Sequence, residues 1–526
     1  MLKDEKGQIT VYLSLIFLVM LSLCMVVLEG MRSYLQSALA EDACKGAGEY
    51  ILANYDKTLF DRYHVFFLDP RERGHIVADG REYFAAYLHK SSFFAFNCRG
   101  LDITKEKTAV DDDGVYLKHQ IREWMKYREV EKAGESLKQL LLSAEKADGR
   151  ARQADQDMQG AGQEIEDKEN KQGGEKALPE TNGEEDAAKK TEKEQQIQEK
   201  ENSPQGKQWK DFYRSLKEIW RTGLLFYVVD HPQEISALSL PDGSYPSEKN
   251  QGIREGFKNF PETFSFLKIE EWKKVLGEMS GKQWKKERRW SDDYFLMNYI
   301  KDSFPSYRQA LEEKTALQYE VEYLIGGKQN DLENLKLVAN RILSFRFLMN
   351  YACLSRDRAW IASSNTAAGI LTGVLGFPQA QKAVQVLLTA SISFGESMLD
   401  THALFSGEKV PVMKTADTWN LTLDNAAQML QKKGPVKKGK VNVGYEDYLQ
   451  LFLLPSLSSS SLLYRMMDLM QSNVTLQEKG FSMEEALFSF CLKAEVECGR
   501  WFVRFPMVEK AGATTGKIRL ERVNSY

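Results

Sequence analysis

ITVYLSLIFLVMLSLCMVVL, residues 9–28, is a run without a charged residue, a proline or a glycine. A helix rises about 1.5 Å per residue, so roughly twenty residues cross a hydrocarbon core of about 30 Å. A helix also pairs its backbone polar groups internally, which lipid requires. Later apolar segments are shorter or carry charges. We therefore predict one transmembrane helix at residues 9–28, in contact with the lipid bilayer, after a short cytoplasmic N-terminus at residues 1–8.

The apolar pattern continues beyond the predicted span. Apolar residues recur at helical spacing, with charges on the other faces. The stripe consists of Leu28, Met31, Leu35, Ala38, Leu39, Ala43, Ala47, Tyr50 and Ile51. We expect one continuous helix from about Ile9 to about Asn54, with its first half in lipid. Its second half, the stalk, would pack on a soluble domain through this stripe.

Three interpretations of the N-terminus are open. The first is a secretory signal, with Lys3 and Lys6 as its basic region and cleavage at the small-residue stretch Ala38–Ala40. Against it, the apolar run is longer than a usual signal core, and the stretch lies about twelve residues beyond its end. The second is a simple uncleaved anchor. The third is a pilin-like stalk, because pilins and pseudopilins share a helix that is half in lipid and half packed on a domain.

Length and composition indicate more than one structural unit. The 526 residues exceed a typical single domain, and 43% of them are hydrophobic, which is enough for a core. The net charge of −4 argues against electrostatic binding of nucleic acid, so we expect no nucleic-acid partner. Between residues 149 and 207 aromatic residues vanish and polar and charged residues dominate, which predicts a disordered insert or linker. The insert would separate a stalk helix and small α+β unit, residues 29–148, from a main α+β domain, residues 208–526.

Periodicity predicts the elements of these domains. Residues 317–325 alternate apolar residues with Gln and Glu, which is the clearest strand pattern in the chain. A helix capped by Asn330 or Asp331 follows, to about Leu354. Further strands are predicted at residues 63–68, 101–110, 487–503 and 517–523, and further helices at residues 82–90, 358–375, 378–404, 445–454 and 462–471. Helices and strands mix without a βαβ repeat, so the predicted class is α+β with antiparallel strands.

No residue pattern indicates catalysis. The histidines are scattered, the six cysteines form no CxxC pair, and the common nucleophile, phosphate and dinucleotide motifs are missing from the sequence. Glu396 and Asp400 share one helical face, where they form either a network with Arg or Lys or an acid–base pair in a cleft. Arg465 and Asp468 have the same two interpretations. We favour structural networks and predict no catalytic residue, no cofactor and no metal site. A disulfide between Cys44 and Cys98 is an alternative to free buried thiols.

Two resemblances to known families add to these patterns. The string EKGQITVY at residues 5–12, with the apolar run and the exit EGMR at residues 29–32, resembles the N-terminus of TadE/TadG-like proteins. Those are minor pilins or pseudopilins of tight-adherence (Tad, Flp) pilus systems. Most of the chain outside the insert resembles an uncharacterised family from Gram-positive bacteria that is encoded with Tad-type machinery. The matching stretches lie at residues 120–128, 319–328, 333–335, 396–400, 407–411, 445–449 and 465–468.

The resemblance implies a single-pass, non-catalytic structural or assembly component of a Tad-like pilus or secretion apparatus. Its partners would be Tad-type components, and its stalk helix would mediate self-association. Tad prepilins are cut after a glycine that a Glu-Tyr pair follows, and here Gly7 and Tyr12 match while Val11 takes the glutamate position. We therefore expect an uncleaved anchor in the cell membrane, with the N-terminus cytoplasmic and the large C-terminal region outside. The alternative is a membrane-tethered envelope sensor, binding protein or hydrolase.

Overall fold

The computed structural model describes residues 5–90, 94, 96–128, 140, 204–249, 290–310, 314–374, 380–457, 459–499 and 515–526. The chain divides into two compact units. Unit 1 comprises Met1–Ile121 and Met470–Tyr526, and unit 2 comprises Arg122–Leu469. The predicted disordered insert, residues 149–207, lies outside the described residues up to residue 203, and its last four residues begin a helix.

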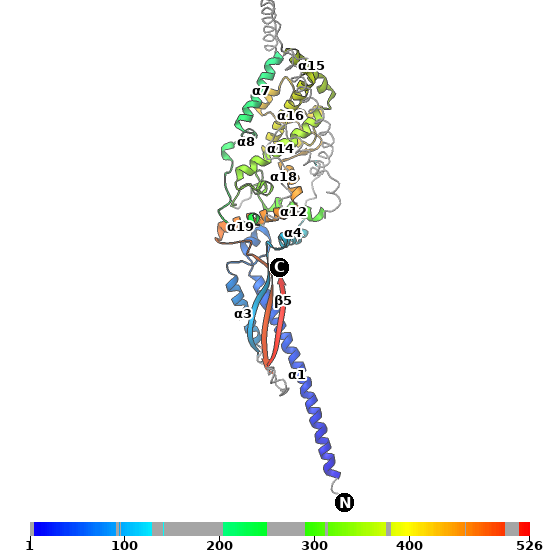
Figure 1. The fold of residues 1–526 in the computed structure, drawn as a ribbon, viewed down its shortest axis with the longest axis vertical. Helices are drawn as coiled ribbons and strands as arrows, with labels where there is room; N and C mark the ends of the chain where they lie inside the picture. The colour runs from blue at the N-terminus through cyan, green and yellow to red at the C-terminus, as the bar shows by residue number, and fades with distance from the viewer. Residues whose placement is uncertain are drawn as a thin grey trace, which may run out of the picture. The chain divides into compact units, whose positions relative to one another are not determined.

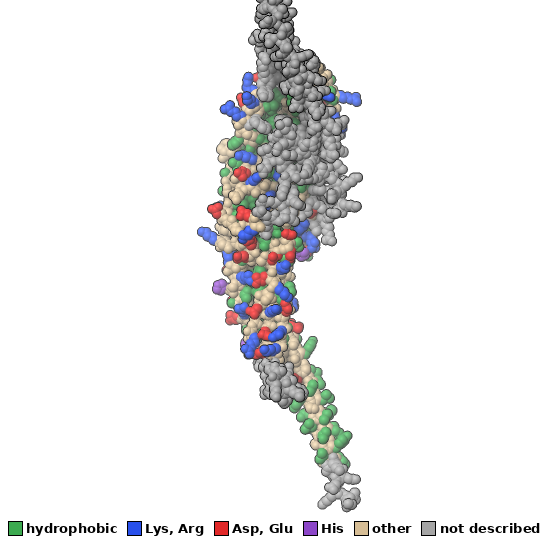
Figure 2. Space-filling view, in the orientation of Figure 1, with side chains coloured by type: hydrophobic (Ala, Val, Ile, Leu, Met, Phe, Trp, Pro, Cys, Tyr) green, Lys and Arg blue, Asp and Glu red, His purple; other side chains and the backbone are tan. Residues whose placement is uncertain are grey.

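Helix α1, Glu5–Ala53, is continuous over 49 residues (Figure 1). Its most apolar window has a mean hydropathy of 2.8 and none of that window is buried. Figure 2 shows its hydrophobic side chains, in green, along the exposed first half. The hydroxyls of Ser14 and Ser22 donate to the carbonyls of Val11 and Val19, each at 2.8 Å, so both polar groups are satisfied within the helix. The prediction of one N-terminal helix that is long and apolar enough to span a membrane is confirmed.

The second half of α1 packs through small residues on two strands and a helix of unit 1. Ala40, Ala43 and Ala47 are fully buried. A Cβ at Gly48 would lie 2.3 Å from the Asn524 side-chain oxygen, so the helix and the sheet approach closely there.

The predicted apolar stripe is therefore only partly correct. Ala43, Ala47 and Ile51 are buried, but Met31 is 60% exposed and Leu35 is 51% exposed. Small side chains at Ala43, Ala47 and Gly48 let the sheet approach the helix closely, whereas Ile51 further along is a large buried residue. The large apolar residues of the early stalk lie on the other side of the helix.

The sheet of unit 1 has three antiparallel strands in the order β1-β4-β5. The strands are β1, Phe96–Thr108, β4, Leu487–Gly499, and β5, Thr515–Ser525. Leu101 of β1 pairs with Ala494 of β4, which in turn pairs with Leu520 of β5. The C-terminal strands, predicted within the main domain 208–526, thus belong to unit 1. The helices of unit 1 besides α1 are α2, Lys57–Tyr63, and α3, Arg73–His89, while α4, Val115–Lys126, begins there.

Unit 2 is helical around two long, mostly buried helices, α14 (Asp331–Leu354) and α16 (Gln381–Phe405), which pack on each other. Asn330 caps α14 by accepting the backbone N–H of Glu333 at 2.8 Å, as predicted. The helices are α7, Pro204–Thr222, α8, Leu224–Val228, α9, Pro246–Lys249, α12, Trp290–Ser303, α13, Glu320–Gly326, α14, Asp331–Leu354, α15, Arg358–Val374, α16, Gln381–Phe405, α17, Ala426–Lys432, α18, Tyr445–Leu453, and α19, Ser460–Gln477. A short ladder joins β2, Val410–Pro411, to β3, Asn442–Val443. Helices with antiparallel strands confirm the α+β class.

Two strand predictions are wrong. Residues 317–325 contain the helix α13, in which Glu320 and Glu322 are fully buried. A period of two indicates a strand only when its polar residues face solvent, and these carboxyl groups do not. In the predicted strand at residues 63–68, Tyr63 ends α2 and Leu68 forms only isolated bridges.

All six cysteines are free thiols, so the alternative of a Cys44–Cys98 disulfide is not realised. Cys44 is buried and Cys98 is half-buried, and burial raises the pKa of both thiols. Both groups therefore stay protonated at neutral pH, which disfavours thiolate chemistry.

Replacing Ile51 by Ala should loosen the contact between α1 and the sheet. Ile51 is fully buried in the unit 1 core, and such a truncation costs about 2–5 kcal/mol. Hydrogen exchange, resolved to peptides of β1, β4 and β5, should become faster in Ile51→Ala. The exposed Met31→Ala variant is the control, and equal exchange in the two variants would contradict this packing.

Candidate functional site

The predicted pair Glu396 and Asp400 lies on α16 within a fully buried charge network. Lys414 Nζ contacts a carboxylate oxygen of Glu396 and lies 2.7 Å from Asp400 Oδ1. Arg346, from α14, donates through Nη2 and Nε to Asp400 Oδ2 at 2.6 and 3.0 Å. Two carboxylates thus face two cations, and the network has no net charge.

Backbone groups complete the network. Arg346 Nη1 donates to the carbonyls of Pro411 and Val412 at 2.9 and 3.1 Å. The N–H of Leu421 donates to Glu396 at 2.8 Å. Burial alone would raise the pKa of Asp400, but the charges of Arg346 and Lys414 hold it below its usual value. Since neither carboxylate reaches solvent, a structural role fits this geometry better than acid–base catalysis.

A second polar centre surrounds Glu322 of α13, whose side chain is also fully buried. Its Oε1 accepts the N–H of Tyr307 at 2.9 Å and the hydroxyl of Tyr445 at 2.7 Å. Burial raises the pKa of Glu322 to about 7, and no cation compensates the charge in the described contacts. This carboxyl group therefore titrates near neutral pH.

The third centre contains Asp468 of α19, which the spacing in the sequence pairs with Arg465. Asp468 Oδ1 accepts the N–H of Ser247 at 3.0 Å, and Oδ2 accepts the hydroxyl of Tyr323 at 2.8 Å. Burial raises the pKa of Asp468 to about 6. Arg465 donates to the carbonyl of Leu324 at 2.9 Å, and its positive charge partly offsets the effect of burial on the pKa of Asp468. Arg465 and Asp468 therefore both contact α13, Asp468 through Tyr323 and Arg465 through Leu324.

Gly327 shows why this corner requires glycine. Its φ is +64°, and an added Cβ would lie 2.3 Å from Arg465 Nη2. The preceding Gly326 is equally tight, since a Cβ there would lie 2.4 Å from Asn334 Oδ1. The Gly-Gly pair therefore lets the end of α13 approach both α14 and α19.

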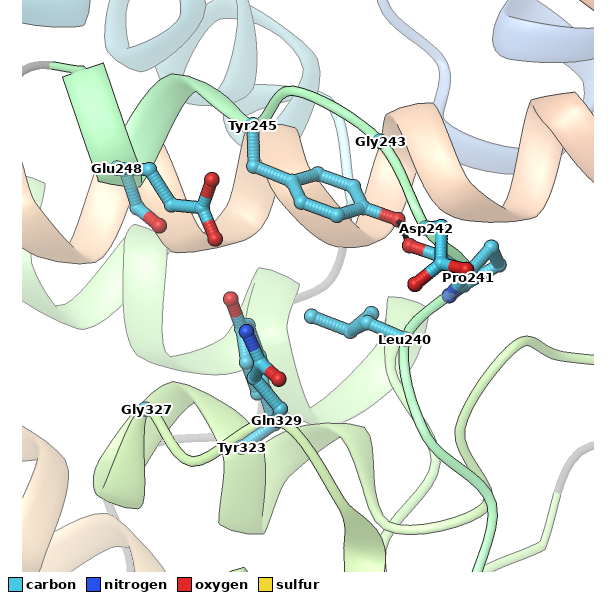
Figure 3. Close-up of a pocket in the computed structure, with 10 residues that line it drawn as sticks. Leu240, Pro241, Asp242, Gly243, Tyr245, Glu248, Tyr323, Gly327 and Gln329 are labelled. Atoms are coloured by element: carbon cyan, nitrogen blue, oxygen red, sulfur yellow. Dashed lines mark hydrogen bonds between the residues drawn. The ribbon is translucent and has the colours of Figure 1, made fainter.

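A polar pocket of about 270 Å³ opens beside this third centre. In Figure 3 the ring of Tyr245 lies on one side of it, and Tyr323 and Gln329 lie on the other. The pocket is lined by Leu240, Pro241, Asp242, Gly243, Tyr245, Ser247, Glu248, Tyr323, Gly327 and Gln329. Asp242 and Glu248 are exposed carboxylates, so the pocket suits a cationic or hydroxyl-rich ligand. Tyr323 connects the pocket to the buried carboxyl group of Asp468.

The three centres bring together stretches that supported the family resemblance. Residues 319–328 contact residues 445–449 through Glu322 and Tyr445, and residues 465–468 through Tyr323 and Asp468. Residues 396–400 and 407–411 meet at Arg346. The pocket was not predicted from the sequence, because its residues come from two segments that no spacing rule relates. Short motifs within these two segments were the only sequence signal that could have indicated the pocket.

The free energy of unfolding should depend on pH through the ionisation of Glu322. Its pKa is about 7 in the folded chain and near 4.5 when exposed, so the native state binds more protons between these values. Stability should fall as pH rises through this window, by up to about 3 kcal/mol. Glu322→Gln retains the acceptor oxygen and should lose this part of the slope, measured by urea unfolding from pH 5 to pH 8. Identical slopes in the two proteins would contradict a buried, uncompensated carboxyl group.

Removing one cation from the buried network should destabilise unit 2 strongly. Lys414→Met leaves Glu396 and Asp400 facing Arg346 alone, and an uncompensated buried charge costs about 3–5 kcal/mol. Lys433→Met is the matched control, because its side chain is 28% exposed and lies 3.8 Å from Asp230. Thermal unfolding followed by circular dichroism should separate the two variants clearly, and comparable melting temperatures would argue against the network.

Comparison with known proteins places these centres in a family. The model of a family of unknown function, DUF5702, matches residues 200–498, which is more than half of the chain. No curated protein and no solved structure matches the sequence. The charge network, Glu322, Asp468 and the pocket all lie within the matched residues. The chain belongs to the DUF5702 family of unknown function.

Proposed function

We propose that this protein is a single-pass, membrane-anchored, non-catalytic component of a Tad-like pilus or secretion apparatus. Its N-terminus lies in the cytoplasm, residues 9–28 span the membrane, and the large C-terminal region lies outside the cell. The observation that supports this most is the outward face of the early stalk. Met31 is 60% exposed, Tyr34 75% and Leu35 51%, beyond the predicted span at residues 9–28. A helix that only tethered a domain would have no use for such a face.

The construction of unit 1 supports the same proposal. One continuous helix is apolar and exposed in its first half, and packs by small residues on an antiparallel sheet in its second half. This division is what the resemblance of residues 5–12 to TadE/TadG-like proteins implies. In an assembly, the outward apolar face would contact other subunits, including further copies of this chain.

The pocket beside Tyr323 favours a second candidate function. A membrane-tethered sensor or binding protein of the cell envelope needs a concave polar site, and this pocket of about 270 Å³ is one. In that case α1 is a tether whose outward face is dispensable. The two functions therefore differ in what they require of α1.

Removing the outward face should abolish assembly but not anchoring. The variant Met31→Ala, Tyr34→Ala and Leu35→Ala keeps strong helix formers and leaves the packed face untouched. Blue-native electrophoresis of mild detergent extracts should show its loss from high-mass complexes, with membrane content unchanged. Lys45→Ala with Glu49→Ala is the control, because these exposed polar residues lie on the same helix.

Retained assembly in the triple variant, or after exchange of residues 9–28 for an unrelated transmembrane helix, would favour the tether. Protease shaving of intact cells tests the orientation separately. The large region should be digested from outside, and its protection would refute the proposed topology.

A further inference from the structure

Three carboxylates of unit 1 converge from separate segments of the chain. Asp56 precedes α2, Asp69 lies between α2 and α3, and Glu478 follows α19. One oxygen from each side chain lies within 4.8 Å of the other two. Asp56 and Asp69 are buried and Glu478 is partly exposed. The cluster thus has a buried floor and one side open to solvent.

Arg71 lies among these carboxylates and binds two of them. Its Nε and Nη2 donate to Asp69 at 3.0 and 2.5 Å, and Nη2 also contacts Glu478. Its Nη2 lies 3.9 Å from Asp56 Oδ2, which is beyond hydrogen-bond distance. One positive charge therefore faces three carboxylates, and Asp56 is the one that Arg71 approaches least closely.

Asp56 has a buried carboxylate oxygen that accepts no hydrogen bond. It is 4% exposed, and its Oδ1 accepts the N–H of Leu59 at 2.7 Å, which caps α2. Its Oδ2 is buried without a hydrogen bond, and one of the Asp56 oxygens lies within 4.8 Å of an oxygen of each of the other two carboxylates. A buried anionic oxygen that accepts no hydrogen bond and has Arg71 only at 3.9 Å is costly, so the place of Asp56 beside two further carboxylates indicates an additional positive ligand.

We infer that Asp56, Asp69 and Glu478 form a site for a divalent cation of the calcium type. Calcium prefers carboxylate oxygens, accepts irregular geometry and completes its shell with water, which the open side at Glu478 would admit. Zinc favours nitrogen and sulfur ligands, and magnesium demands a tight octahedron. Arg71, whose side chain is 28% exposed, swings toward solvent when the cation binds, and the two cations compete for one site.

The cation would join the segment that follows α1 to the end of α19. Thr58 already donates to Glu478 at 2.6 Å across this junction, so the two segments are in contact before any cation binds. Calcium would add a charged link between residues that are more than four hundred positions apart. Binding should therefore raise the unfolding temperature of unit 1.

Calcium titration of the detergent-solubilised full-length chain tests the site. Isothermal titration calorimetry with calcium chloride should show one saturable site with a dissociation constant of roughly 0.1–1 mM, the range of extracellular modules. Magnesium should bind at least about tenfold more weakly. Absence of calcium binding in both the wild type and Arg71→Gln would overturn the inference.

Arg71→Gln separates the cation site from a simple ion-pair cluster. If Arg71 competes with calcium, its loss should tighten calcium binding several-fold, and calcium should restore the melting temperature. If the three carboxylates pair only with Arg71 and bind no calcium, the variant should be destabilised and calcium should not restore its melting temperature. Glu478→Gln should abolish binding while keeping the acceptor for Thr58, and its circular dichroism spectrum controls for folding. Unchanged calcium affinity in Glu478→Gln would also overturn the site.

Discussion

The close packing of a small-residue face of α1 on β4 and β5 is the constraint on which unit 1 depends. Ala40, Ala43 and Ala47 bring the helix near enough for Gly48 to touch Asn524. Large apolar residues of the early stalk such as Met31 and Leu35 stay exposed, while Ile51 further along the helix is buried. One helix thus combines an exposed apolar first half with a second half that packs on a protein core.

Unit 2 differs from unit 1 in that charged side chains are fully buried in its interior. The network of Arg346, Lys414, Glu396 and Asp400 is neutral and hydrogen-bonded to carbonyls and amides around α14 and α16. Such groups add little net stability compared with an apolar core, but removal of one partner leaves a costly uncompensated charge. Glu322 lacks a cation among its described contacts and is neutral at low pH, so its protonation in unit 2 is sensitive near neutrality.

Local patterns predicted most elements and missed what depends on distant partners. The long apolar N-terminal helix, its length and the Asn330 cap follow from nearby residues, and the structure agrees with them. The buried side of the stalk was misassigned, because Met31 and Leu35 are apolar while buried Arg32 and Gln36 are polar. Helix α13 was predicted as a strand, because in the sequence its buried glutamates cannot be distinguished from glutamates that face solvent. The pocket and the acidic cluster each combine segments far apart in sequence, and no local pattern encodes such a meeting.

The sheet of unit 1 places a constraint on the order of folding. β1 ends at Thr108 and its partner β4 begins at Leu487, so all of unit 2 is synthesised between two neighbouring strands. Contacts this remote close slowly, because the intervening chain must first be made and compacted. Unit 2 can therefore fold before the alanine face of α1 is covered. Strand β5 follows β4 in the chain and contacts α1, so this face is covered only once β5 has been made.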